Sequence, residues 1–206
     1  MSNSRTNANK KEKRYNEYID SAIKVFEQKG YHNTRVKDIT EEAGTSVGNF
    51  YRYFDSKEKI FEMVIDQFYN LMLKELKKLQ AFDVPPVSLI KDLITSYFKI
   101  FKEKRKIALI YIEQMGGINN EFKKKKNEYQ DNFAKEVEKI IQKLVELKVT
   151  RIQNVKVTAR VWTSSLVEIF RWWIHTDFEL DEQELIEDIT NFLVFGTMKK
   201  NSRKRI

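Results

Sequence analysis

The chain has 206 residues, 41% of them hydrophobic, and its 38 lysines and arginines outnumber 30 aspartates and glutamates, for a formal net charge of +8. A chain of this length can bury a hydrophobic core without stabilisation by disulfide bonds or metal ions. The absence of cysteine excludes disulfides, thiolate zinc sites, iron–sulfur clusters and cysteine nucleophiles. The two histidines, His32 and His175, stand alone, so we expect no metal site and no cofactor.

The sequence also bears on location and partners. Its longest unbroken apolar run, residues 107–112, is too short to cross a membrane, and the polar first 14 residues are not a secretory signal. We therefore expect a soluble, cytoplasmic protein with no membrane partner. The basic excess is diffuse, because residues 1–80 hold 15 basic and 12 acidic side chains; it permits binding to a polyanion without establishing it.

Helical periodicity runs through almost the whole chain, which contains only two prolines and six glycines. Apolar residues at helical spacing predict a first helix over residues 15–29, with Gly30 as its C-terminal cap. Two short helices are predicted over residues 35–43, closed by Gly44, and 47–54, capped by Ser46. A long amphipathic fourth helix follows the capping residues Asp55 and Ser56 and reaches residue 79.

The prolines at positions 85 and 86 mark a boundary. Beyond it the pattern predicts helices over residues 86–103, 105–115, 120–148, 154–176 and 181–199, and Gly116 and Gly117 end the second of these. The four lysines at 123–126 are most simply a solvated face. The predicted class is all-α: a three-helix N-terminal unit joined by a fourth helix to a larger helical domain.

Residues 35–54 carry the functional signal. Two short helices separated by Gly44, Thr45 and Ser46 predict a helix-turn-helix, whose second helix enters the DNA major groove. That helix is rich in hydrogen-bonding side chains, while Phe50 and Phe54 lie four residues apart and are predicted to anchor it to helices one and four.

The motif G-Y-x-x-T-x-V-x-D-I at residues 30–39, followed by A-G-x-S-x-G-x-F-Y-R-Y-F-x-S-K-E at residues 43–58, resembles the DNA-binding domain of the TetR/AcrR family of transcriptional repressors. The resemblance covers residues 12–72, and residues 73–206 match only in layout. It implies a helix-turn-helix domain over 12–72, with a ligand-binding and dimerisation domain over 73–206. It also implies three partners: operator DNA, a second copy bound through the last two helices, and a hydrophobic effector.

The resemblance further implies roles for single residues. Thr34 would cap the second helix and bind a phosphate, Lys37 would reach a phosphate or a guanine edge, and Lys57 would bind a phosphate. Arg52 is the best candidate for a base contact, with a phosphate contact as the alternative. The residues implied to meet DNA are Thr34, Lys37, Thr45, Ser46, Val47, Gly48, Asn49, Tyr51, Arg52, Tyr53 and Lys57. Thr40 and Thr45 depart from the usual alanine and valine, and we expect only small local adjustments.

In the second domain, helix 154–176 carries two adjacent stripes, one strongly apolar and one containing Val161 and Trp172, and a helix of this kind must be covered on both faces. Aromatic side chains supply ligand-binding candidates, although ordinary core packing is the simpler reading for each. Glu113 lies in an apolar segment, where a carboxylate must be paired, protonated or facing a polar ligand; Gln114 and Glu168 are weaker candidates. The predicted ligand-binding residues are Tyr97, Phe98, Phe101, Tyr111, Glu113, Phe133, Trp162, Phe170 and Trp173.

These observations predict a homodimeric repressor released from a pseudo-palindromic operator by a hydrophobic effector. The alternative is a helical ligand-binding or interaction protein whose helix-turn-helix no longer reads DNA. The sequence offers no nucleophile with a base, no glycine-rich phosphate loop and no carboxylate pair, so we do not expect an enzyme. Lysines 10, 11 and 13 with Arg14, or the basic tail after Met198, could add electrostatic contacts to DNA.

Overall fold

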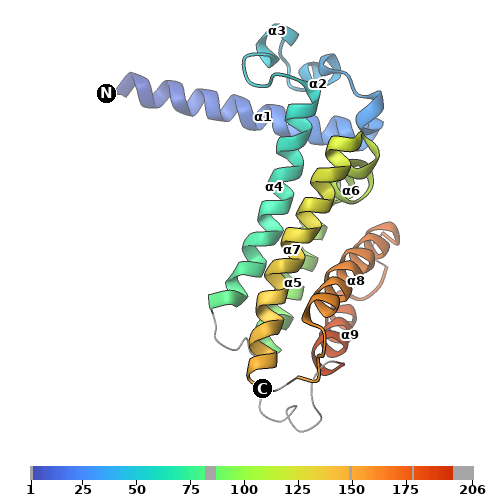
Figure 1. The fold of residues 1–206 in the computed structure, drawn as a ribbon. Helices are drawn as coiled ribbons and strands as arrows, with labels where there is room; N and C mark the ends of the chain where they lie inside the picture. Colours follow the sequence, from blue (N-terminus) through green and yellow to red (C-terminus); the bar gives the residue numbers. More distant parts are fainter. Residues whose placement is uncertain (1, 82–86, 149, 178, 197–206) are drawn as a thin grey trace. The chain divides into compact units, whose positions relative to one another are not determined.

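The computed structural model describes residues 2–81, 87–148, 150–177 and 179–196, and it confirms the all-α class (Figure 1). The long helices are α1 (Ser2–Asn33), α4 (Lys57–Lys78), α5 (Val87–Glu103), α7 (Asn120–Glu146), α8 (Val155–His175) and α9 (Glu182–Phe195). The shorter ones are α2 (Val36–Glu42), α3 (Val47–Phe50), η1 (Leu79–Ala81), α6 (Arg105–Leu109), a π-helical turn η2 (Ile110–Gln114) and a 3₁₀ turn η3 (Met115–Gly117). No helix in these ranges combines the length and the apolar character that a membrane crossing requires.

The chain divides into two compact units. The first unit comprises residues 1–68 and 106–123, and the second unit comprises residues 69–105 and 124–206. This division differs from the boundary that we placed at residue 72, since it cuts α4 after Phe68 and returns the α6–η3 segment to the first unit. The functional division into residues 12–72 and 73–206 stays a prediction.

Three elements differ from their sequence predictions. Helix α1 begins at Ser2 instead of near Tyr15, and it kinks at Gly30, whose φ of 73° is accessible to glycine without a Cβ penalty. Helix α3 ends at Phe50, so residues 51–53 lie in turns. The predicted helix 105–115 is a short α-helix that widens into the π-turn and then tightens to 3₁₀. The proline boundary and the predicted end at residue 199 fall outside the described residues.

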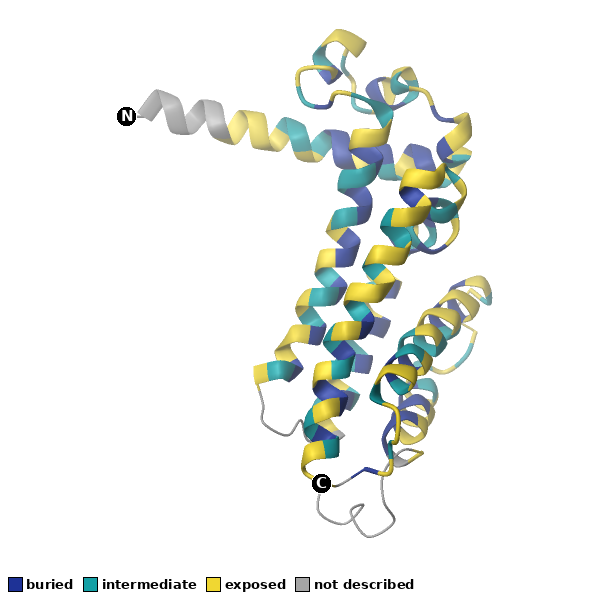
Figure 2. Ribbon diagram, viewed as in Figure 1, coloured by how far each residue is buried: buried dark blue, intermediate teal, exposed yellow. Residues whose placement is uncertain are grey.

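Aromatic rings fill the core of the first unit. The Phe61 ring lies edge-on to Phe26, Tyr31 and Phe122, with centroids 4.8–5.2 Å apart. Edge-to-face pairs of this kind contribute about 0.5–1.5 kcal/mol beyond the area they bury. Figure 2 shows the accompanying change along α1, whose described N-terminal turns are exposed and whose later turns are buried.

The second unit has a separate aromatic core. Helix α5 packs against α8 and α9, and the Phe170 ring stacks on Phe101 at 4.2 Å. Phe98 lies edge-on to both Phe170 and Trp173, at 4.9 and 4.6 Å. The fully buried Tyr97 donates its hydroxyl hydrogen to the Met72 carbonyl at 3.1 Å, so its polar group is satisfied inside the core.

The end of α1 is fastened to the start of α4 by Tyr31, Lys57 and Glu58. The Lys57 ammonium donates to the carbonyls of Tyr31 and Thr34 at 2.7 and 2.8 Å and lies 4.0 Å from the Tyr31 ring centroid. The Tyr31 hydroxyl donates to the Glu58 carboxylate at 2.6 Å. Burial raises the pKa of Tyr31 well above its usual value, and the bond from Tyr31 lowers the pKa of Glu58.

Replacing Tyr31 by phenylalanine removes the hydroxyl and keeps the ring. We expect Tyr31→Phe to lower the free energy of unfolding at neutral pH by about 1 kcal/mol, because the bond is charge-assisted but the carboxylate is solvent-accessible. The folded-state pKa of Glu58 is depressed, so the stabilisation is present above its unfolded-state pKa and is lost as pH falls through the folded value. Urea unfolding of both proteins at neutral pH and at about pH 4 measures this; a pH-independent difference would contradict the assignment.

Candidate nucleic-acid interface

The turn between α2 and α3 has the geometry that a helix-turn-helix requires. Gly44 has a φ of 61°, which lets the chain reverse directly after the α2 cap, Ala43. The Thr45 amide then donates to the Thr40 carbonyl at 2.9 Å, closing the turn. Thr40 is buried, and its hydroxyl donates to the Lys37 carbonyl three residues upstream, so its polar group is satisfied at this position.

Ser46 starts α3 as predicted. Its hydroxyl oxygen accepts a hydrogen bond from the Asn49 amide at 3.2 Å, which satisfies one of the free N–H groups of the first turn. Phe50 and Phe54 are both buried, at 0% and 2% exposure, and their ring contacts with Tyr15 and Tyr18 confirm the predicted anchor on α1, while the predicted contact with α4 stays a prediction.

Tyr18 of α1 holds the recognition segment in place. Its fully buried ring lies edge-on to Phe50 and Phe54, at 5.6 and 5.9 Å, and is tilted against Tyr53 at 5.4 Å. Its hydroxyl accepts from the Asn49 side-chain amide at 3.0 Å and donates to the Thr45 hydroxyl at 3.3 Å. Sequence reasoning counted Tyr18 only as part of an apolar stripe, because nothing in the linear pattern pairs it with residues 27 to 36 positions away.

This packing divides the predicted DNA-contacting residues into two groups. Thr45, Asn49 and Tyr53 are half-buried, and the Asn49 amide also donates to the Thr45 hydroxyl at 3.0 Å, so these side chains position α3. The exposed group presents a free edge of the segment to solvent, with Val47 at 39% and Tyr51 at 53% exposure. Its members are Ser46, Val47, Gly48, Tyr51 and Arg52.

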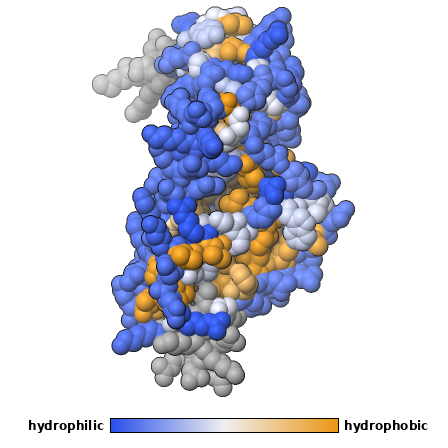
Figure 3. Space-filling model, turned by 45° about the vertical axis from the view of Figure 1, so that its right-hand side comes forward, coloured by the Kyte–Doolittle hydropathy of each residue, from blue (hydrophilic) through white to orange (hydrophobic). Residues whose placement is uncertain are grey.

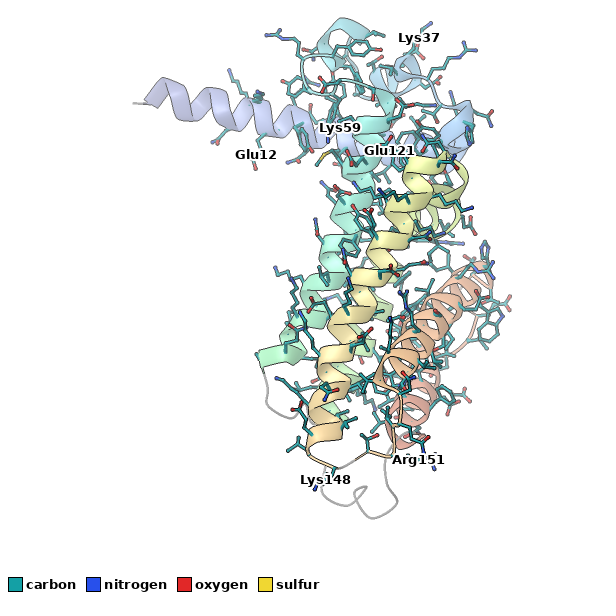
Figure 4. All side chains as sticks on the ribbon, in the orientation of Figure 1. Glu12, Lys37, Lys59, Glu121, Lys148 and Arg151 are labelled. Carbon is teal, nitrogen blue, oxygen red and sulfur yellow. The ribbon has the colours of Figure 1, made fainter. Side chains whose placement is uncertain are left out.

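Three residues outside α3 received predicted DNA contacts. The prediction that Thr34 caps α2 is wrong: the N-cap is Arg35, whose amide donates to Asp38 at 2.7 Å. Thr34 is 1% exposed and its hydroxyl donates to the Gly30 carbonyl, so in this conformation it offers no surface to a phosphate. Lys57 is engaged by two carbonyls, as described above, and its phosphate contact stays a prediction. Lys37 is exposed on α2, near Glu41, and projects into solvent (Figure 4).

A segment from the middle of the chain also supports α1. The Gln114 side chain accepts from the Tyr31 amide at 3.0 Å and donates to the Phe26 carbonyl at 3.3 Å, while Lys106 pairs with Glu27. The sequence offered Gln114 only as a weak ligand candidate, and these backbone contacts give its amide a structural role instead. Glu113 is exposed, so water can solvate its carboxylate and burial does not require it to contact a ligand.

Most predicted ligand-binding residues belong to the second unit. Tyr97, Phe98, Phe101, Trp162, Phe170 and Trp173 are buried there and Phe133 is half-buried, whereas Tyr111 and Glu113 belong to the first unit, where Tyr111 packs on Phe68. Their ligand contacts remain predictions. Glu168 is exposed and pairs with Arg171 at 2.6 Å.

Helices α8 and α9 carry most of the exposed large apolar side chains in the part of the chain that the structure describes. The first predicted stripe of α8 is buried or half-buried, and the second is largely exposed, with Val161 and Trp172 each at 49% exposure. Phe192 of α9 is 62% exposed. Figure 3, in which this side is turned forward, shows hydrophobic surface gathered over the second unit.

Comparison with known proteins decides the family. Residues 19–64 match the family of bacterial regulatory proteins called tetR, and residues 83–197 match the tetracyclin repressor-like C-terminal domain. The chain belongs to the TetR family. It is therefore a DNA-binding transcriptional regulator and not an enzyme, and the helix-turn-helix described above is its DNA-reading element.

Similarity in sequence and fold to other regulators extends over most of the length of this TetR-family regulator. The fatty acid metabolism regulator protein of Bacillus subtilis is 24% identical over 195 residues, covering 92% of this chain and 98% of its own. The fatty acid degradation regulator FadR from Bacillus halodurans has the same fold, with a TM-score of 0.75, 23% identity and coverage of 89% and 95% of the two chains. FadR from Bacillus subtilis, solved in complex with stearoyl-CoA, gives a TM-score of 0.72 at 22% identity, with coverage of 88% and 98%.

Substitution of Gly48 is expected to affect DNA binding without affecting folding. A Cβ built at Gly48 meets no atom within 4 Å, and its φ is not positive. We expect Gly48→Ala to keep or raise the free energy of unfolding, by up to about 1 kcal/mol. On DNA the added methyl would occupy the surface facing the bases, so we expect operator affinity to fall about tenfold or more.

Gly117→Ala is the matched control, because Gly117 is also exposed and also has room for a Cβ. Thermal unfolding and fluorescence-anisotropy titration with operator DNA measure both quantities. Equal DNA affinities for Gly48→Ala, Gly117→Ala and the wild type would contradict the placement of Gly48 at the DNA.

Proposed function

We propose that this regulator is a homodimeric repressor that binds a pseudo-palindromic operator and is released from it by a long-chain fatty acyl thioester. The observation that carries the DNA half of the proposal is the exposed edge at Ser46, Val47 and Gly48 on a segment fixed by Tyr18. A rigid element with an exposed, small-residue edge can approach base edges without a cost for ordering it. We infer a cytoplasmic location, because the bacterial regulators of this family act on DNA.

The apolar outer faces of α8 and α9 support self-association. Five large apolar side chains on these two helices are each between 37% and 62% exposed: Val157, Val161, Val167, Trp172 and Phe192. Exposed apolar side chains in such number are typical of a surface that is buried by a partner. Two copies related by a two-fold axis would cover each other with the same surface. Two-fold symmetry in turn requires an operator with two inverted half-sites about one helical turn of DNA, or a multiple of it, apart.

The effector class rests on the second unit and on the relatives. The aromatic groups of α5, α7 and α8 are suited to an apolar chain, and Phe133, which is half-buried, already reaches the surface of this cluster, 6.4 Å from Tyr97. One relative with the same fold was solved with stearoyl-CoA bound. Release requires that the effector bind more tightly to a conformation that does not fit the operator.

The proposal is tested in two steps with the full-length protein. Sheared DNA from the source genome is incubated with the immobilised protein, and the bound fragments are sequenced. We expect fragments that share an inverted repeat and whose binding weakens steeply with salt. Recovery of no common site would contradict the DNA half of the proposal.

Stearoyl-CoA is then titrated into the complex with a recovered operator, with free CoA and stearate as separate controls. We expect stearoyl-CoA to release the DNA and CoA alone to have no effect, because the apolar chain supplies most of the affinity. Phe133→Ala should bind the operator normally and need more stearoyl-CoA for release. No release, together with no stearoyl-CoA bound in native mass spectrometry, would contradict the effector assignment.

A further inference from the structure

The basic N-terminal turns of α1 and the recognition segment share one groove within the first unit. Its volume is about 700 Å³, and its walls come from residues 10–17 of α1 on one side and from residues 49–53 on the other. The lining residues are Lys10, Lys11, Lys13, Arg14, Glu17, Asn49, Arg52 and Tyr53. Five of these eight side chains are cationic and one is anionic.

The charges on α1 are sorted by face. Residues three, four and seven positions apart lie on one side of a helix, which places Lys10, Arg14 and Glu17 together toward the groove. The neighbouring flank of the same turns is lined by Asn9, Glu12, Lys13, Asn16, Glu17 and Asp20, which carry more negative than positive charge. Figure 4 shows Glu12 on the side of α1 away from α3 in that view. Lys13 and Glu17 line both sides, so the separation of charge rests on Lys10, Lys11 and Arg14 toward the groove and on Glu12 and Asp20 toward the flank.

The groove is anchored at its inner end and open at its outer end. The Arg14 guanidinium pairs with Glu17 at 2.8 Å and donates to the Ala43 carbonyl at 3.4 Å, and the Tyr15 ring stacks on Phe54 at 5.1 Å. Lys10, Lys11 and Lys13, one turn further out, are exposed and form no ion pair with any other side chain that the structure describes. Lys10 stands about 12 Å along the helix axis from Tyr18.

Arg52, one of the exposed residues of the recognition segment, also lines this groove. It follows the α3 cap, Tyr51, and lies in a turn, where it is exposed and has no ion-pair partner among the described residues. Small-molecule pockets are mainly apolar with a few polar groups, whereas this groove is mainly cationic and open. An extended polyanion fits its chemistry better than a compact ligand does.

We propose that Lys10, Lys11 and Lys13 of α1, with Arg52, bind the phosphodiester backbone of the DNA that flanks each operator half-site. The proposal rests on the proposed function, because it needs the recognition segment to be seated on DNA. These contacts extend the stretch of DNA that the protein binds beyond each half-site, and they add affinity that is independent of base sequence. The proposal also assigns Arg52 to a phosphate and leaves base reading to the exposed edge of α3.

The test compares the full-length wild type with the triple variant Lys10→Gln, Lys11→Gln, Lys13→Gln. Each protein is titrated against the captured operator in two lengths, one ending at the inverted repeat and one extended by about ten base pairs on each side. The matched control, Lys74→Gln, Lys99→Gln, Lys104→Gln, removes three exposed lysines of the second unit. Circular dichroism checks that all three proteins are equally helical.

We expect the wild type and the control to bind the extended duplex about tenfold or more tightly than the short one, and the triple variant to bind both lengths equally. The slope of log affinity against log salt on the extended duplex should become shallower by up to about 2.7 per protomer, since each phosphate contact contributes about 0.9. Arg52→Gln should weaken the operator and a random-sequence duplex by the same factor.

Three results would overturn the proposal. The first is an unchanged salt slope and length dependence in the triple variant while the wild type binds its operator, which leaves the proposed function intact. The second is a triple variant that binds DNA as the wild type does but no longer binds vesicles containing anionic phosphatidylglycerol, which would assign the lysines to a lipid surface. The third is a wild type that binds no DNA site, which overturns the proposed function as well.

Discussion

The position of the recognition segment in the helix-turn-helix depends on one buried tyrosine. Helix α3 has only four residues, too few to be stable as an isolated helix, so it needs an external support. Tyr18 supplies that support through apolar contact with Phe50 and Phe54 and through hydrogen bonds to Thr45 and Asn49. Ring packing fixes the distance of α3 from α1, and the hydrogen bonds fix its rotation about its own axis. The edge that reaches solvent is therefore the one that Tyr18 does not occupy.

Three covalent crossings link the two compact units, within α4, between Arg105 and Lys106, and within α7. The second crossing leads directly into the α6–η3 segment, whose Gln114 contacts the backbone of α1 on both sides of Lys29. The chain thus runs from the end of α5 through Arg105 directly into this segment of the first unit. The π-turn at residues 110–114 interrupts the regular hydrogen-bond ladder of the helix in this segment.

The sequence predicted those features that depend on local chemistry or on strict spacing. Gly44 at the turn, Ser46 at the cap and the pair Phe50 and Phe54 follow from backbone conformation and helical period, and each is confirmed. Features set by tertiary contact were beyond it. Thr34 and Lys57 look like surface residues in the linear pattern, yet the fold buries one and binds the other to two carbonyls. Glu113 differs in the opposite direction: its apolar neighbours suggest burial, but it lies exposed within the π-turn, and its ligand contact stays a prediction.

The most direct test of the account is the substitution Tyr18→Phe, which removes the hydroxyl and keeps the ring packing. We measure the affinity of the full-length protein for its captured operator and for a random-sequence duplex at the same salt concentration. The account predicts that helicity and binding to the random duplex are retained, while the ratio of the two affinities falls about tenfold, because Thr45 and Asn49 lose the group that orients α3. An unchanged ratio would contradict the claim that Tyr18 sets the DNA-reading geometry.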